Sequence, residues 1–295
     1  MKKVSLLMFA AIVATSVVFS SYGNEKESKR DPVPGKITIT TSGGSRKVAF
    51  SLNQFRKDQL SISGIGGMAT IDWGDGSAID TVMFSEDGIK LSYEYSDTTA
   101  QTITITGTDL TSFATLCERY VTNLDVSEAT GLVCLGIEGF LEGDVTKREI
   151  VLYNVNHQLK ELDVTKNTAL ESLTVDGQLT ELNVTQNTAL VHLHVPNNKL
   201  AVLDVSKNTA LKFLTVSKNQ LTALDVTHNT ALIQLAVNGN QLDDTALNAL
   251  FGTLHPYPES LVGYRKTIDI SENPGSNNCD QSIANGNGWR VQIGY

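Results

Sequence analysis

Two histidines separated by one position are the residues of this chain best placed to hold a metal ion. His192 and His194 would point to the same side of an extended strand, and the repeat described below places Asp176 on the neighbouring strand. A zinc site needs a third or fourth ligand at about 2.1 Å. Because the pattern supplies no such set, we interpret the pair as surface histidines and expect no metal site.

Nucleophilic catalysis would need a cysteine beside a base. The closest candidates, Cys134 and His157, lie six strand positions apart in the predicted register, an offset of about 20 Å. A nucleophile and its base must be in hydrogen-bond contact. The sequence also has no G-x-S-x-G, no H-E-x-x-H, no P-loop and no dinucleotide-binding motif. We therefore expect neither enzymatic activity nor a cofactor.

The three cysteines are predicted to be free thiols. Cys117 and Cys134 fall on neighbouring predicted strands but four positions out of line, which is about 13 Å and too far for a disulfide. The third is Cys279.

Three aspartates, Asp72, Asp75 and Asp80, cluster around the segment WGDGS at residues 73–77 and suggest calcium. Their spacing lacks the alternating D-x-D-x-D-G of an EF-hand loop. An Asp-Gly pair between two extended segments is typical of a tight hairpin, which we take as the explanation.

These side chains must be positioned by a repeat that fills the second half of the chain. The aligned leucines Leu162, Leu182, Leu203 and Leu224 are separated by 20, 21 and 21 residues. Blocks such as QLTELNVTQNTAL alternate with a second motif such as LTVSKNQL. This period, with L-x-x-L-x-V-x-x-N-x-L spacing, indicates a solenoid in which each turn stacks on the one before it.

Each turn is predicted to contribute one strand to a concave sheet, starting at an inward-facing leucine such as Leu193 or Leu214. Residues 138–150 break the register and are expected to bulge. Counting back by the repeat places earlier strands at Leu173, Leu152, Leu135 and Ala114.

Asparagine recurs at both corners of the predicted turn. Its side chain can donate to and accept from backbone groups that water cannot reach. The first ladder is predicted at Asn198, Asn219 and Asn240. The second, which should do the same at the opposite corner, is predicted at Asn167, Asn187, Asn208 and Asn229.

The outward positions of the concave strands are the candidate binding residues. Exposed aromatic side chains are the usual anchors of an interface, which singles out Tyr153 and Phe213, flanked by the two histidines. The alternative is that these side chains only fill the groove between neighbouring strands. The predicted ligand-binding set is Tyr153, Asp176, His192, His194, Phe213, Thr215 and Gln234.

The repeat resembles the leucine-rich repeat family, and the 21-residue form with L-D-V in its outer arm is similar to the bacterial internalin type. Upstream, residues 36–108 alternate apolar and polar residues, which predicts six or seven short strands of an antiparallel β-sandwich. Within them, WGDGS resembles the hairpin of PKD-type immunoglobulin-like modules. The resemblance to leucine-rich repeats implies that the concave strand face recognises a protein or a glycan.

We therefore expect a mixed fold, with a PKD/Ig-like β-sandwich followed by a leucine-rich repeat solenoid and a C-terminal α/β cap. The cap is predicted from apolar residues at helical spacing behind Asp243, followed by a strand, a short helix and a last strand. The expected segments are a signal peptide (1–23), a linker (24–35), the sandwich (36–108), the repeats (109–242) and the cap (243–295).

Charge and the N-terminus bear on the compartment and the partners. The net charge is −9, and an acidic chain without a Lys/Arg run argues against nucleic acid and anionic membranes as partners. Lys2 and Lys3 precede an apolar stretch from Val4 to Phe19, and small residues follow at Ser21 and Gly23, as in a secretory signal peptide. Tyr22 stands where a lipoprotein would carry its acylated cysteine, so we expect export without a lipid anchor and without membrane insertion.

The function predicted from these patterns is non-catalytic recognition or adhesion by an exported, monomeric protein. It would be periplasmic, secreted or at the cell surface, and its concave face would bind an extracellular protein. Two alternatives stay open. The ligand could be a glycan, because PKD-like modules often accompany saccharide-handling proteins, or the chain could be a structural envelope spacer without a ligand.

Cleavage of the signal peptide is directly testable. N-terminal sequencing of the exported protein should begin near Asn24, because Ser21 and Gly23 supply the small residues that signal cleavage requires. Full-length chain retained in the cytoplasm would contradict this prediction. Incorporation of a labelled fatty acid would contradict the absence of a lipid anchor.

Overall fold

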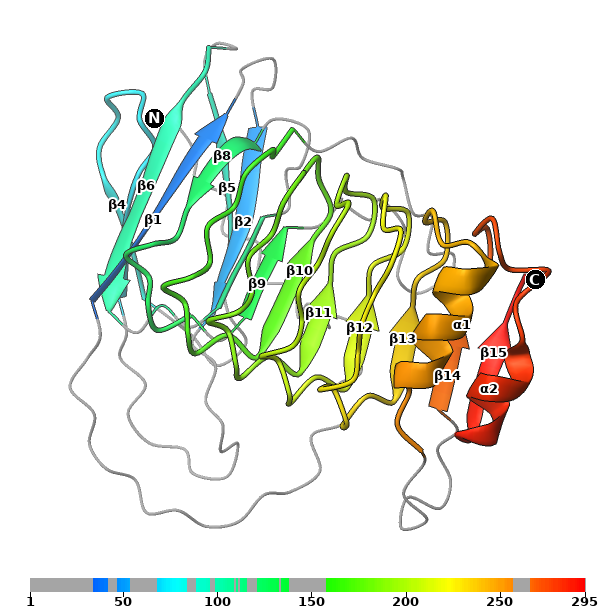
Figure 1. Ribbon diagram of the computed structural model, residues 1–295. Helices are drawn as coiled ribbons and strands as arrows, with labels where there is room; N and C mark the ends of the chain where they lie inside the picture. The colour runs from blue at the N-terminus through cyan, green and yellow to red at the C-terminus, as the bar shows by residue number, and fades with distance from the viewer. Residues whose placement is uncertain are drawn as a thin grey trace, which may run out of the picture.

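The structure is a computed structural model that describes residues 34–41, 47–53, 68–83, 89–95, 99–108, 110, 112–115, 121–132, 134–137, 158–256 and 266–294. The predicted signal peptide, the predicted bulge, Cys117, Leu152, Tyr153 and His157 lie outside these residues. In the described part, antiparallel strands form one end of an elongated molecule, coils stack beside them, and two helices lie at the other end (Figure 1). None of the helices described is long and apolar enough to cross a membrane.

The antiparallel end contains a five-stranded sheet with the order β4 (Asp80–Met83), β3 (Met68–Asp72), β6 (Thr102–Thr108), β1 (Pro34–Thr41) and β8 (Val121–Asp125). Alternate residues of β1 are buried, as the period-two pattern predicts. Ile37 and Ile39 of β1 lie opposite Ile105 and Ile103 of β6, and these side chains form part of the core. Because β1 begins at Pro34, the last two residues of the predicted linker belong to this strand.

Trp73, in the turn between β3 and β4, organises the core of this end. Its ring is buried and stacks on Tyr93 of β5 (Ile89–Glu94), with ring centroids 4.5 Å apart. The carbonyl of Trp73 accepts a hydrogen bond of 2.9 Å from the Tyr95 hydroxyl, whose pKa is raised by burial. Gly74 has a φ of +80°, and a side chain there would lie 2.3 Å from the carbonyl oxygen of Thr102, so the turn requires glycine.

The three aspartates of this segment act as hydrogen-bond acceptors. Asp72 and Asp75 each accept from the backbone N–H two residues further on. Asp75 also accepts from the Tyr93 hydroxyl at 2.9 Å, and Asp80 accepts from the Trp73 indole N–H at 2.7 Å. These contacts are those of a hairpin that its own side chains stabilise.

A ten-stranded sheet runs along the molecule from the antiparallel end to the helices (Figure 1). Neighbouring strands are antiparallel from β5 to β7 and parallel from β7 to β15. After β5 the order is β2 (Lys47–Asn53), β7 (Ser112–Thr115), β9 (Cys134–Ile137), β10 (Ser172–Val175), β11 (His192–His194), β12 (Phe213–Thr215), β13 (Gln234–Ala236), β14 (Lys266–Asp269) and β15 (Trp289–Gln292).

The predicted register of the repeats is confirmed from β10 onward. Leu173 lies opposite Leu193, Leu193 opposite Leu214, and Leu214 opposite Leu235. The same register continues to Ile268 of β14. All five side chains are at most 1% exposed, and burial of each contributes roughly 1.5–3 kcal/mol.

Two predicted strand positions before β10 are wrong. β9 pairs directly with β10, with Leu135 opposite Leu173, so no strand starting at Leu152 lies between them. The repeat pattern weakens in residues 138–150, so counting by the period across them does not predict which strands pair on either side. In β7, Phe113 and not Ala114 lies opposite Leu135. Phe113 is fully buried, since its large apolar side chain gains far more from burial than alanine would.

The antiparallel end and the repeats share both sheets. β8, which contains Leu124 of the first L-D-V motif, pairs with β1, and β7 pairs with β2. Hydrogen bonds therefore cross the boundary predicted between residues 108 and 109. The buried apolar residues of the described part also form one continuous cluster. The antiparallel end thus covers the core of the first turn.

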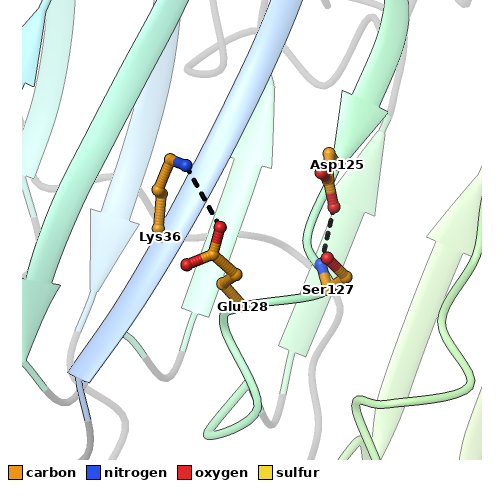
Figure 2. Close-up of polar contacts among 4 residues, drawn as sticks. All are labelled: Lys36, Asp125, Ser127 and Glu128. Atoms are coloured by element: carbon orange, nitrogen blue, oxygen red, sulfur yellow. Dashed lines mark hydrogen bonds and ion pairs between the residues drawn. The ribbon is translucent and has the colours of Figure 1, made fainter.

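The surface of this junction carries an ion pair (Figure 2). Lys36 of β1 places its Nζ 3.1 Å from Oε1 of Glu128, in the loop after β8. Nearby, Asp125 accepts a hydrogen bond of 2.9 Å from the backbone N–H of Ser127. Both side chains of the ion pair are exposed, so the pair contributes at most about 1 kcal/mol. The shared sheets and the core hold the junction.

Asn219 shows how the first asparagine ladder joins successive turns. Its Nδ2 donates to the carbonyls of Val195 in the previous turn, at 2.9 Å, and Val216 in its own turn, at 3.0 Å. Its Oδ1 accepts from the N–H of Leu200 in the previous turn at 3.0 Å. The predicted ladder is confirmed, because equivalent bonds are made by Asn198, Asn240 and Asn273.

The residue before each ladder asparagine has a left-handed backbone. The φ angle is 53° at Asn197, 52° at Lys218, 67° at Gly239 and 59° at Glu272. This conformation costs about 1–2 kcal/mol for a residue other than glycine. It recurs where the chain leaves the strand, so every one of these turns uses the same sharp corner.

The turn that starts at Leu173 lacks the ladder asparagine. Gln178 donates its N–H to the carbonyl of Leu159, as Lys199 donates to Leu179 one turn later. Gln178 and Lys199 are therefore equivalent, although they lie five and six residues after their respective strand leucines. The residue missing from this 20-residue turn is the one at the asparagine position.

The asparagine side chains of the second ladder donate hydrogen bonds but accept none. Asn187 gives both Nδ2 hydrogens to the previous turn, at 2.9 Å to the Val164 carbonyl and 2.8 Å to the Asn167 carbonyl. Asn167 does the same to Val126 and Ala129, which shows that these two turns are adjacent. We predicted acceptance as well, but the buried Oδ1 atoms of this ladder have no partner: Asn167, Asn187, Asn208 and Asn229.

In the described part, two helices and two strands follow β13 at the far end of the molecule (Figure 1). Helix α1 (Asp244–Thr253) starts after Asp243, whose side chain accepts from the N–H of Ala246, and it buries Leu247, Leu250 and Phe251. Helix α2 (Gln281–Gly286) precedes β15. Lys266 of β14 is 2% exposed, with its Nζ 5.1 Å from the centre of the Trp289 ring. Burial lowers the pKa of this lysine.

Each L-D-V motif is followed by a small turn on the outer arm. Asp204 accepts from the N–H of Ser206 at 2.9 Å, and Asn183 accepts from Thr185 in the same way. Hydrogen bonds from the following Thr or Ser lower the carboxyl pKa of Asp163, Asp204 and Asp225.

Replacement of Asn219 by alanine should lower the free energy of unfolding by about 1–3 kcal/mol, because buried backbone groups of two turns lose their partner. Lys218→Ala keeps the left-handed backbone with a side chain that is exposed in the native protein, and should change stability by less than about 0.5 kcal/mol. Urea unfolding measures both. Equal unfolding midpoints for the two variants would refute the role assigned to the ladder.

The depressed aspartate pKa values predict that stability falls in acid. Their contribution is complete above the ordinary pKa of 3.8 and is lost as the pH falls through the lower folded-state values. Asp204→Asn keeps an acceptor oxygen, as Asn183 does in the native chain. It should reduce the loss of stability between about pH 5 and pH 2.5 and change stability at neutral pH by less than about 0.5 kcal/mol. Urea unfolding across this pH range tests the prediction. If the free energy of unfolding of the variant depended on pH as in the native chain, the stabilising role assigned to the outer-arm turn would be wrong.

Candidate binding surface

Outward side chains of β10 to β13 form rows across the parallel sheet, because these strands are paired in register. Neighbouring strands lie about 4.8 Å apart, so successive members of one row can touch. The first row contains Ser172, His192, Phe213 and Gln234. The second contains Thr174, His194, Thr215 and Ala236.

His192 and Phe213 form an aromatic stack in the first row. Their ring centroids are 4.8 Å apart, and the ring planes differ by 4°. Both side chains are half-buried. Burial lowers the pKa of His192, Lys212 lowers it further, and Glu171 acts in the opposite direction. The ring is therefore mainly neutral at pH 7.

His194 lies in the second row between Thr174 of β10 and Thr215 of β12. Desolvation lowers its pKa as well, although the side chain keeps an exposed surface. The two histidines therefore present uncharged rings on adjacent rows of the same strand at neutral pH.

The rim of the sheet, just after the strands, carries hydrogen bonds between turns. Asp176 accepts from Nδ2 of Asn197 at 2.8 Å, and the Ser217 hydroxyl donates to the amide oxygen of Asn238. Asp176 is therefore engaged at the rim. Among the residues that the structure describes, no three His, Cys, Asp or Glu side chains are grouped as a metal site would require.

The structure brings together most of the predicted binding residues. His192, His194, Phe213, Thr215 and Gln234 lie on the neighbouring strands β11, β12 and β13, and Asp176 follows β10. Tyr153 is outside the described residues. In the second row, Gly136 of β9 lies directly opposite Thr174 of β10.

Sequence reasoning missed that the rows continue into the cap. Thr267 and Asp269 of β14 lie opposite Gln234 and Ala236, and Arg290 and Gln292 of β15 extend the rows further. The signal was present in the alternation of Ile268 and Ile270. Once those side chains are inward, the residues between them must face outward.

The outer arm of the coils differs in charge from the strand face. It presents exposed lysine and glutamate side chains in successive turns: Lys160, Glu161, Lys166, Glu181 and Lys207. The outward positions of β11, β12 and β13 carry no carboxylate, lysine or arginine.

Comparison with known proteins finds similarity among solved structures. No family model and no curated protein matches the chain, whereas 22 chains of solved structures do. One is the functional domain of InlJ from Listeria monocytogenes, described as including a cysteine ladder. It is 24% identical over 58% of this chain and 41% of that chain, with a TM-score of 0.37. Another is the internalin InlF of the same species, at 19% identity over 58% and 51%, with a TM-score of 0.41. This chain spans less than two thirds of either neighbour.

Proposed function

We propose that the chain is an exported, non-catalytic recognition protein whose parallel strand face binds an extracellular protein. The observation that carries this proposal is the His192–Phe213 stack, which lies within a sheet held by parallel backbone pairing on both sides. Partly exposed aromatic side chains on a rigid surface can anchor an interface without losing much conformational freedom.

The finer description of the fold belongs to the same proposal. We infer a leucine-rich repeat solenoid, with a PKD/Ig-like sandwich covering its first turn and an α/β cap covering its last. In-register parallel strands and the asparagine ladder support the solenoid. The stack of Trp73 on Tyr93, between strands of the two sheets, supports the sandwich.

The geometry of the stack favours a protein over a glycan. A sugar ring packs on the open face of an aromatic ring, but the rings of His192 and Phe213 each cover one face of the other. The outward positions beside the stack carry the hydroxyl of Thr215 and the amide of Gln234. Half-buried aromatic rings beside small polar groups suit a packed protein surface.

One purified mature chain, used as bait in two assays, tests the proposal. Capture of extracellular-matrix proteins, identified by mass spectrometry, is expected, together with no signal on a glycan array. Binding to glycans alone would replace the protein partner with a saccharide. Failure in both assays would favour a structural spacer.

Phe213→Ala should weaken binding of a captured protein by about 2 kcal/mol or more, because a central aromatic anchor is lost. Lys166→Ala and Lys207→Ala are matched controls on the outer arm and should change binding by less than about 0.5 kcal/mol. Surface plasmon resonance gives the affinities, and circular dichroism verifies the fold of each variant. If the lysines mattered and Phe213 did not, the strand face would not be the binding surface.

A further inference from the structure

We propose that the strand face binds an uncharged partner surface and releases it on acidification, with His192 and His194 taking up the protons. This inference rests on the proposed function and concerns the same surface. Its central part, called here the contact centre, is formed by the outward residues of β11, β12 and β13: His192, His194, Phe213, Thr215, Gln234 and Ala236.

The contact centre has no fixed charge, although the chain carries a net charge of −9. Two acids at its margins already accept hydrogen bonds: Asp176, at the rim, from Asn197, and Asp269, of β14, from the N–H and hydroxyl of Ser271. A charged partner group would be desolvated here without an opposite charge, which is strongly unfavourable. A surface of apolar and neutral polar groups fits instead, and its binding should depend little on salt.

The two histidines are the titratable side chains of the contact centre. His192 lies between Ser172 and Phe213, and the charged groups that act on it are Lys212 and Glu171, which oppose each other. His194 lies between Thr174 and Thr215, so its direct neighbours in the sheet are uncharged. No carboxylate of the contact centre is present to stabilise a proton on either ring.

The direction of the effect follows from burial. Both histidine pKa values are below the usual 6.5, so both rings are mainly neutral at pH 7. A partner that covers the rings removes further water and disfavours the charged form more strongly. Affinity is therefore full above the free-state pKa values and falls as the pH drops through them, by up to tenfold for each unit that binding lowers a pKa.

The fold should persist through this pH range. The aspartates of the outer-arm turns have pKa values below 3.8, so they remain ionised near pH 5. A loss of binding near pH 5 then reports the contact centre and not unfolding, and circular dichroism at that pH verifies this.

The first test needs no partner. NMR titration of the imidazole signals, assigned with His192→Gln and His194→Gln, should give pKa values below 6.5 for both rings. Phe213→Leu removes the stacked ring and should raise the pKa of His192 towards 6.5 while leaving His194 nearly unchanged. If His192 titrates at or above 6.5 in the native chain, or ignores Phe213→Leu, the inference fails whatever the binding results are.

The second test uses basement-membrane extract immobilised on a sensor as the probe for the mature chain. Retention should fall at least about fivefold between about pH 7.5 and pH 5 and change less than about twofold between about 0.1 and 0.5 M salt. The double variant His192→Gln/His194→Gln should be retained equally at both pH values, and Lys166→Ala should behave like the native chain.

The outcomes separate the two proposals. Retention that is insensitive to pH, or a double variant that responds to pH like the native chain, overturns the inference and leaves the proposed function intact. Strong loss of retention in high salt would show that the partner surface is charged, and would overturn that part of the inference. Absence of retention under all conditions overturns the proposed protein partner, and the inference with it.

Discussion

The structure depends on how the chain leaves each parallel strand. At that corner, backbone N–H and C=O groups of two successive turns are buried away from water, and each would cost free energy if it had no partner. Asparagine is a short side chain that both donates and accepts. Asn219 uses both functions at once, towards Val195 and Leu200 of the previous turn. Because its partners belong to a neighbouring turn, the interaction sets the spacing between turns as well as the shape of one, and the rows of outward side chains follow from that spacing.

A stack built in this way has two open ends, and the chain covers them differently. At the first end, β1 and β2 extend the sheets into an antiparallel layer. Ala129 stands where later turns have the second-ladder asparagine: Leu132 donates its N–H to the Ala129 carbonyl, as Leu170 does to Asn167. At the other end the first ladder continues to Asn273, and α1 replaces the outer arm of the next turn, with Thr253 accepting from the N–H of Val226. Each end therefore supplies hydrogen-bond partners for backbone groups of the turn that it covers.

The same framework separates the chemical character of the two sides. Side chains at outer-arm positions reach solvent, where a charged group has no desolvation cost. The aspartates there accept hydrogen bonds from backbone N–H groups of their own turn. Strand positions are crowded by neighbours about 4.8 Å away on each side, which favours small polar or stacked aromatic groups. The half-buried His192 ring against Phe213 is a result of this crowding. The outward positions of β11, β12 and β13 carry such groups and no fixed charge, although the chain is acidic.

Much of this protein was determined by its sequence alone, because the information is local and periodic. The leucine period set the register from Leu173 to Leu235, the recurring asparagines marked the corners, and Asp243 marked the start of a helix. The sequence failed where the outcome depends on which segments meet in space. Only the tertiary structure decided that β9 pairs directly with β10, that Phe113 fills the first turn, and that β8 joins the antiparallel sheet. A periodic pattern predicts how a turn is built, but pairing across an irregular segment depends on packing and hydrogen bonding between residues far apart in the chain, which no local spacing records.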